Sequence, residues 1–341
     1  MGDDSVAFTF IGTIIGAGFA SGQEIRKYFV DFGIYGILGL IIVTLLFIFI
    51  GEKMMILGYS SKSDSYDKVL SYAFRCKFKK VIDYILCGFL IGTASTMFSG
   101  TGAFFNQVFS WSPAVGSLLM AILTVAITMV GITTIMKIST FIVPILIFIT
   151  SIISVSSIEN IDVTKISLIN EISGNCVVYV ILSSVIYAAY NLILGMPVLV
   201  TLGSVAKNKK QIRMNSIFAG GLIGLFGFII YSALFINYGT IYGTEIPIMA
   251  LTSNFGLLWY GISFVIAVLT TSVGSLFGVY TRFNKNKKLF LLFTVIAYLF
   301  SLVGFSNLVA NLYFVMGILG IFIISMLLYG ANKSSVLRKV N

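Results

Sequence analysis

Long apolar runs follow one another along nearly the whole chain, and this feature limits its possible folds most. A helix needs about 20 apolar residues to cross a bilayer, and hydrophobic residues make up 58% of the 341 positions. Charged residues make up only 10%, too few to cover a surface that faces water. We therefore predict an all-α polytopic membrane protein with a single transmembrane domain over residues 1–341.

Short polar segments divide the apolar sequence into ten predicted membrane spans. The spans are 5–29, 33–59, 81–110, 113–132, 135–156, 174–203, 212–237, 256–281, 289–306 and 308–330. Because the connections between them are short, no soluble domain is expected. The first run follows neither a basic segment nor a cleavage site, so we expect it to be retained as a helix and not removed as a signal peptide.

The basic residues predict the orientation of the chain. With the N-terminus in the cytoplasm, 19 of the 22 Lys and Arg residues fall on the inner side, and the exceptions are Arg26, Lys27 and Lys165. Basic loops are retained in the cytoplasm, so both termini are predicted to be cytoplasmic. The net charge of +10 then reflects topology, with membrane lipid and no nucleic acid as the expected partner.

The residue types that usually build catalytic sites are scarce. The chain has no His, and Cys76, Cys87 and Cys176 lack the spacing of metal ligands. No pair of intramembrane carboxylates is evident, and neither a ring of charges nor a filter-like repeat indicates a channel. We therefore expect neither an enzyme nor a resident cofactor.

The first span contains a segment in which a regular helix is weak. It reads Gly12-Thr-Ile-Ile-Gly-Ala-Gly-Phe-Ala-Ser-Gly-Gln-Glu24, with glycines at 12, 16, 18 and 22. Each Gly costs up to about 1 kcal/mol in a helix relative to Ala. The glycines also fit a small-residue packing face, but packing does not account for Gln23 and Glu24. We predict an interrupted helix whose free carbonyls and amides can bind a ligand.

The apolar sequence of the sixth span is also interrupted by polar residues and a proline. Tyr187, Tyr190 and Asn191 lie near its centre, and Pro197 follows. Interruptions in spans one and six, five helices apart, are typical of a five-plus-five inverted repeat. We predict repeats over 5–156 and 174–330, with helices one and six both broken.

Hydroxyl side chains mark the third and eighth spans, at Gly92–Gly102 and Ala267–Ser275. Ser and Thr oxygens can bind a small hard cation, and they also hydrogen-bond neighbouring helices. Packing is the favoured interpretation for the third span. In the eighth, three consecutive hydroxyls point to several faces of the helix, so both interpretations stay open.

The segment Gly12–Glu24, in a chain with ten predicted spans, closely resembles the YkvI family of bacterial membrane proteins. Its first part, Gly12-Thr-Ile-Ile-Gly-Ala-Gly18, is also similar to the first helix of aromatic and hydroxy amino-acid permeases, and so to the amino acid-polyamine-organocation superfamily with the LeuT fold. The resemblance implies a secondary active transporter in a bacterial plasma membrane, moving a small amino-acid-like or related organic solute by alternating access. The first helix of the permeases continues with a Leu-Pro ending that this chain lacks. The substrates of the permeases therefore cannot be assigned to this chain.

The resemblance also implies a Na⁺ site between the first and eighth helices. Matched by position, its ligands would be the carbonyls of Gly12, Ile15 and Ala267 and the hydroxyls of Thr270 and Thr271. Na⁺ is therefore the expected coupling ion.

A solute pocket beside the two helix breaks is implied in the same way. Its residues would be Gly16, Ala17, Gly18, Phe19, Tyr187, Ala188, Tyr190 and Asn191. Amides at a half-helix N-terminus would receive a carboxylate of the solute, and half-helix carbonyls would receive its ammonium group.

Alternatives stay open for two charged residues. Glu24 is either a coupling or gating group or a residue near the outer mouth that pairs with Arg26, Lys27 or water. Lys137 could replace Na⁺, as a fifth-helix lysine does in some proton-coupled relatives, although extension of its side chain to the membrane surface is favoured. A proton-coupled carrier and a non-transporting ligand sensor are thus the alternative functions.

Another open question concerns the segment Glu245–Pro247, before the eighth span. It is either a loop that caps a transport pathway or a plain surface turn.

Overall fold

A computed structural model describes residues 3–61, 76–130, 133–158, 176–283 and 285–333. Within these ranges the regular structure is helical, and no strand occurs. The longer helices are α1 (Asp3–Ile14), α4 (Gly36–Ser61), α6 (Cys76–Phe109), α7 (Pro113–Val130), α8 (Thr133–Ile158), α10 (Cys176–Val205), α11 (Lys209–Ile236), α14 (Asn254–Arg282), α15 (Lys287–Ser301) and α17 (Tyr313–Lys333). The short helices are α2 (Ala17–Ala20), α3 (Gln23–Tyr28), α12 (Tyr238–Ile241), α13 (Pro247–Ala250) and α16 (Phe305–Asn307).

Six helical segments in the described part of the chain are long and apolar enough to cross a membrane. They are Val30–Ser61, Lys79–Phe109, Val177–Val205, Lys209–Ile236, Gly256–Arg282 and Phe305–Gly330. The all-α membrane class is therefore confirmed, while the number of ten crossings and the repeat boundaries 5–156 and 174–330 stay predictions. Lys165 lies outside the described residues.

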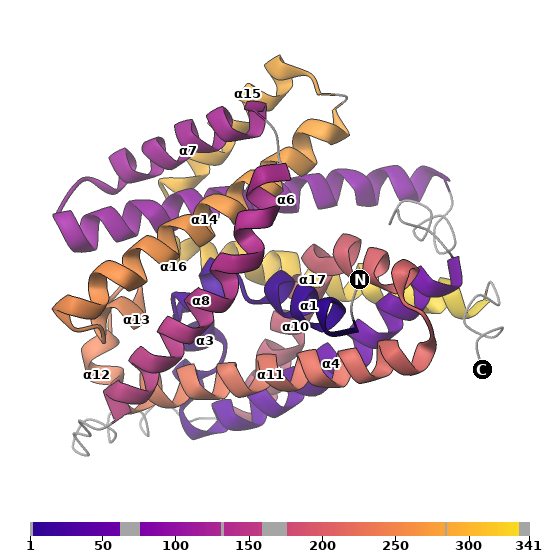
Figure 1. Cartoon of the computed structure of the whole chain (residues 1–341), viewed down its shortest axis with the longest axis horizontal. Helices are drawn as coiled ribbons and strands as arrows, with labels where there is room; N and C mark the ends of the chain where they lie inside the picture. Colours follow the sequence, from indigo (N-terminus) through magenta and orange to yellow (C-terminus); the bar gives the residue numbers. More distant parts are fainter. Residues whose placement is uncertain (1–2, 62–75, 131–132, 159–175, 284, 334–341) are drawn as a thin grey trace.

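Helices α1 and α10 lie in the middle of the molecule, with α4 and α11 on one side and α6, α7 and α15 on the other (Figure 1). Helix α10 packs most extensively against α4 and α17. The two spans predicted to hold the functional site are therefore central, surrounded by the other helices.

Two glycines allow α4 and α10 to cross in backbone contact. A Cβ on Gly58 would overlap the carbonyl of Val200, and a Cβ on Gly203 would overlap the carbonyl of Met55. Small residues let membrane helices approach closely and pack firmly. This crossing fixes α10 against the second span.

The first span is broken twice, as its glycines predict. Helix α1 ends at Ile14, and Gly16 has extended backbone, with φ −99° and ψ −172°. Helix α2 ends at Ala20, and Gly22 has φ 79° and ψ −8°, in the left-handed region. Glycine adopts such a φ without steric cost, so the interrupted first helix is confirmed.

The sixth span differs from its prediction, because α10 runs from Cys176 to Val205 without a break. Its central amide is bonded inside the helix, since Asn191 Nδ2 donates to the carbonyl of Tyr187 at 3.1 Å. Pro197 removes only one backbone donor, a loss that membrane helices tolerate when neighbouring groups compensate. The predicted break in the sixth helix is therefore wrong for this structure.

Candidate functional site

The second break in the first span is closed by hydrogen bonds within the protein. The Ser21 carbonyl accepts from the amide of Ile248 at 3.0 Å. The Ser21 hydroxyl donates to the Gly18 carbonyl at 2.6 Å and accepts from the amide of Gln23 at 3.1 Å. The backbone groups beside Gly22 thus have partners within the protein, namely the Ser21 hydroxyl and the amide of Ile248 in α13.

The first break is different. The amide of Ile15 donates to Ile11 at 2.7 Å and that of Gly16 donates to Ile14 at 3.0 Å. Among the hydrogen bonds of the described residues, none reaches the carbonyls of Gly12 or Ile15. A Cβ on Gly16 would meet no other atom within 4 Å, so open space adjoins the break. Two predicted Na⁺ ligands therefore have carbonyls free to bind a cation.

The eighth span supplies the other half of the predicted Na⁺ site. The hydroxyls of Thr270 and Thr271 both donate to the Ala267 carbonyl, each at 2.9 Å. Helix α14 also contacts the first span, since Tyr260 Oη donates to the Ala20 carbonyl at 3.3 Å. No hydrogen bond between described residues joins the two halves of the set, so the five-ligand shell stays a prediction.

Glu24 lies in the first turn of α3 and is buried, with 5% of its surface exposed. Its Oε2 accepts a hydrogen bond from Tyr187 Oη of α10 at 3.3 Å. A Cβ on Gly18 would overlap Glu24 Oε1, so the missing side chain leaves room for the carboxylate against α2. The structure thus brings a predicted coupling residue together with two predicted solute-binding residues.

Four buried tyrosines form what we call the tyrosine cluster: Tyr28, Tyr187, Tyr190 and Tyr313. Ring centroids are 5.3 Å apart for Tyr28 and Tyr187, 5.4 Å for Tyr187 and Tyr190, and 4.7 Å for Tyr190 and Tyr313. Tyr190 Oη is buried and has no hydrogen-bond partner in the described part of the chain. Sequence reasoning missed two members. Tyr28 could have been found, because it lies four residues after Glu24 on the same helix face, whereas nothing in the sequence indicates Tyr313.

Among the other predicted solute-binding residues, the one side-chain hydrogen bond to the cluster in the described part of the chain runs from the Asn191 amide to the backbone carbonyl of Tyr187. The ring of Phe19 lies against α11, with Cζ 3.7 Å from the Cβ position of Gly227. Ala17 and Ala188 are buried, and the Asn191 amide is bonded within α10. The side chain of Lys137 lies outside the described part of α8.

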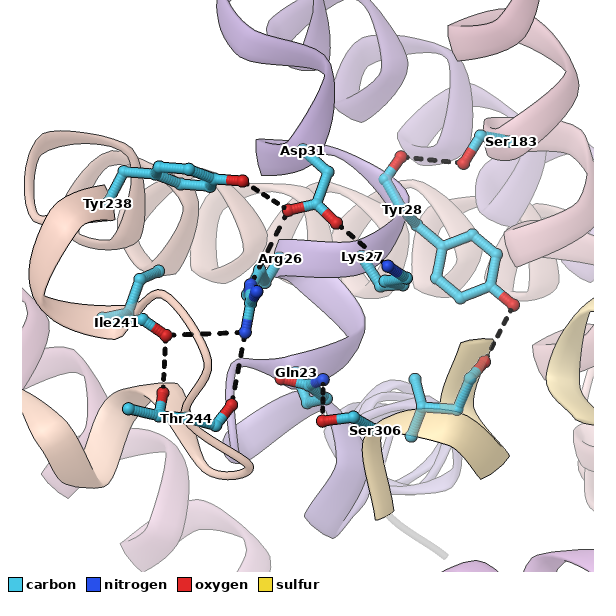
Figure 2. Close-up of polar contacts among 11 residues, drawn as sticks. Gln23, Arg26, Lys27, Tyr28, Asp31, Ser183, Tyr238, Ile241, Thr244 and Ser306 are labelled. Carbon is cyan, nitrogen blue, oxygen red and sulfur yellow. Dashed lines mark hydrogen bonds and ion pairs between the residues drawn. The ribbon is translucent and has the colours of Figure 1, made fainter. Parts of the chain in front are cut away.

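The nearby basic residues pair with Asp31 and not with Glu24. Arg26 Nε lies 3.6 Å from Asp31 Oδ1, and Lys27 Nζ lies 3.3 Å from Asp31 Oδ2, as Figure 2 shows. No ion pair of Glu24 occurs among the described residues. The interpretation that pairs Glu24 with Arg26 or Lys27 is therefore wrong.

Asp31 connects the first span to the segment after α11. Tyr238 Oη donates to Asp31 Oδ1 at 3.3 Å, and Arg26 Nη1 donates to the Thr244 carbonyl at 3.2 Å (Figure 2). Burial, and then the nearby Asp31 carboxylate, raise the pKa of Tyr238 to about 12, so its phenol stays protonated and able to donate. We call Arg26, Lys27, Asp31, Tyr238 and Thr244 the Asp31 network.

The segment Glu245–Pro247 is also linked to the first span by hydrogen bonds. Gln23 Nε2 donates to Ser306 Oγ at 2.6 Å, and the amide of Ser306 donates to Glu245 Oε2 at 2.7 Å. Ile246 and Pro247 are buried. The segment therefore covers the second break of the first span and is not a plain surface turn.

No protein-family model matches the chain. It is 28% identical over 341 residues to the uncharacterized membrane protein YkvI of Bacillus subtilis, covering 95% of this chain and 94% of YkvI. The resemblance indicated by the first span is confirmed, and it extends over nearly the whole length of both proteins.

Two solved structures have a similar backbone. A substrate-bound, outward-open Na⁺-coupled sialic acid symporter matches with a TM-score of 0.65 and 16% identity, covering 97% of this chain and 78% of that one. MhsT in complex with L-phenylalanine matches with a TM-score of 0.61 and 18% identity, covering 94% and 87%. The chain has the LeuT fold. In this LeuT-fold protein, which crosses the membrane several times, the broken first span and α10 form the centre of the molecule.

Proposed function

We propose that the chain is a secondary active transporter that moves a small amino-acid-like or related organic solute by alternating access, coupled to Na⁺. The observation that carries this proposal is the contrast between the two breaks in the first span. The protein binds its own backbone groups at the second break, but among the described residues no hydrogen-bond donor reaches the carbonyls of Gly12 and Ile15 at the first. Unpaired polar groups inside a membrane protein are costly, so they are retained where they bind a ligand.

Na⁺ fits the chemistry of this break. It is a hard cation that prefers oxygen ligands, and the two free carbonyls are such ligands. Thr270 and Thr271 direct their hydroxyl protons to Ala267, which leaves oxygen lone pairs to complete the shell. Ala267 is the weakest member of the set, because its carbonyl already accepts from both threonines.

Alternating access requires a closure that can open. Through side chains, the Asp31 network and the Gln23 bond to Ser306 tie α3 and the residues that follow it to α12, to Thr244 and to α16. Individual bonds of this kind contribute about 1 kcal/mol and can be exchanged for bonds to water. By the distribution of Lys and Arg, this closure would face the outside of a bacterial cell, with both termini cytoplasmic and lipid around the helices.

Proton coupling is the second candidate, favoured by one observation. Glu24 is buried and has no ion pair among the described residues, so a proton could neutralise it. Like the Na⁺-coupled carrier, a proton-coupled one would have neither a resident cofactor nor an enzymatic activity. A ligand sensor on the same fold would bind solute without moving it.

Uptake into liposomes tests these possibilities. Purified protein would be reconstituted and offered a mixture of radiolabelled amino acids under an inward Na⁺ gradient, an inward proton gradient or neither. Uptake that requires the Na⁺ gradient and is weakened in Thr271→Ala supports the proposal. Uptake that follows the proton gradient and is lost in Glu24→Gln favours the second candidate. Stabilisation by an amino acid without uptake under any gradient would identify a sensor.

A further inference from the structure

Glu24 is a buried carboxylate without an adequate internal partner. The one hydrogen bond of ordinary geometry to it among the described residues comes from the neutral phenol of Tyr187 at 3.3 Å, while the phenol of Tyr190 lies nearby without forming such a bond. The nearest basic residues in sequence, Arg26 and Lys27, are bound to Asp31 instead. A buried carboxylate is ordinarily retained only where a cation or several donors compensate for the water that it loses. A missing cation is therefore the simplest account of this position.

The surroundings of Glu24 favour an organic cation. Tyr187 donates to Glu24, the rings of Tyr28 and Tyr190 lie 5.3 and 5.4 Å from the ring of Tyr187, and the ring of Tyr313 lies 4.7 Å from that of Tyr190. Aromatic faces attract ammonium groups, and the buried hydroxyl of Tyr190 has no partner among the described residues. A protonated amine would give Glu24 its missing charge and would donate one N–H to the carboxylate and another to Tyr190.

The geometry separates this position from the expected Na⁺ site. Na⁺ requires several oxygen ligands, and the free carbonyls that could supply them are at the first break, on Gly12 and Ile15. Around Glu24 the groups are mostly aromatic rings, which are poor replacements for the hydration shell of a small cation.

We propose that Glu24 and the tyrosine cluster bind the ammonium group of the transported solute. The solute class is then primary amines and amino acids with a free ammonium group, and it excludes organic acids that lack one. This inference rests on the proposed function in that the solute is the cargo, but it concerns binding and can be measured without flux.

Thermal unfolding of the purified full-length protein in detergent tests the proposal. The probes are three matched sets, each with an amino acid, its decarboxylated amine and its deaminated acid. They are alanine, ethylamine and propionate; leucine, isoamylamine and isocaproate; and phenylalanine, phenethylamine and hydrocinnamate. We expect the amino acid and the amine of at least one set to stabilise the protein in a saturable way, with no effect of the acid.

Two variants assign the effect to this site. Glu24→Gln should raise the apparent Kd of the stabilising amine about tenfold or more, because a charged partner is lost, while the matched control Glu52→Gln on α4 should leave it unchanged. Tyr190→Phe should weaken binding without lowering the unfolding temperature of the ligand-free protein, because the hydroxyl that it removes has no described partner. This second variant keeps the test decisive if Glu24→Gln does not fold.

Several results would overturn the assignment. These are equal stabilisation by the acids, unchanged amine affinity in both Glu24→Gln and Tyr190→Phe, stabilisation by Na⁺ alone that disappears in Glu24→Gln, or stabilisation by no member of the three sets. Failure of the transport proposal has a different signature, namely amine binding that depends on Glu24 with no uptake into liposomes.

Discussion

In both the first and the sixth span, polar residues together with glycine or proline interrupt the apolar sequence, but the backbones of the two spans differ. Gly16 is extended and Gly22 has φ 79°, which divides the first span into the three helices α1, α2 and α3. Helix α10 contains two central tyrosines, Asn191 and Pro197, yet it stays helical from Cys176 to Val205. The difference teaches that polar side chains alone do not open a membrane helix. Glycines at positions with non-helical dihedral angles do.

The energetic reason lies in where the backbone groups find partners. Opening α10 would release several amides and carbonyls into apolar surroundings, at a cost of several kcal/mol for each unpaired group. Its polar side chain offers no replacement, because Asn191 already bonds within the helix. In the first span, Ser21 and Ile248 rebind the groups released at the second break, which offsets most of the cost there.

The largest effect on stability is expected for Gly22→Ala. A side chain at φ 79° is strained, and its Cβ would lie 2.9 Å from Ile248 Cγ1. We expect a loss of about 2 kcal/mol or more in the free energy of unfolding. The matched control is Gly221→Ala in α11, where a Cβ meets nothing within 4 Å and Ala is the better helix former by about 1 kcal/mol. Thermal unfolding of both variants in detergent checks this, and equal unfolding temperatures would contradict the role given to Gly22.

Sequence reasoning predicted the first-span break because glycine spacing directly limits backbone geometry. It could not predict the continuity of α10, because the sequence does not reveal that the Asn191 amide bonds to Tyr187 and not to a ligand. The sequence alone could not place Tyr313 at the site, because this residue contacts Tyr190 only through the packing of α17 on α10. The proposed Na⁺ shell stays a prediction for the same reason, because the separation of α1 and α14 depends on the packing of the whole bundle.

The next largest effect is expected for Gly18→Ala, measured as affinity and not as stability. Gly18 lies in the short helix α2, and a methyl group there would occupy the position of Glu24 Oε1. The carboxylate would have to move away from α2, and we expect the Kd of the best-stabilising amine to rise about tenfold. Titration by thermal shift checks this. Unchanged affinity would mean that the position of Glu24 against α2 does not matter for binding.

Gly16→Ala sharpens the contrast between the two breaks. Its extended backbone suits any residue and its Cβ position is open, so the fold should be kept, with stability unchanged or raised by up to about 1 kcal/mol. The added methyl would, however, narrow the space beside the free carbonyls. We expect a few-fold rise in the Na⁺ concentration needed for half-maximal thermal stabilisation. A clear drop in stability would show that Gly16 is needed for the fold instead.

The smallest effect is expected for Asn191→Ala, which asks whether α10 stays closed when the protein works. The variant loses one buried hydrogen bond, about 1 kcal/mol, and gains helix propensity of about 0.6 kcal/mol, so stability should change by less than about 0.5 kcal/mol. Because the Asn191 side-chain amide already donates to the Tyr187 carbonyl at 3.1 Å, it is not available to the solute. The affinity for the amine should therefore fall by less than about threefold. A tenfold loss, with stability unchanged, would mean that solute binding frees Asn191 from its helix. The sixth span would then open only in the bound state, because contacts with the ligand would offset the free energy that is lost when the helix opens at its polar residues.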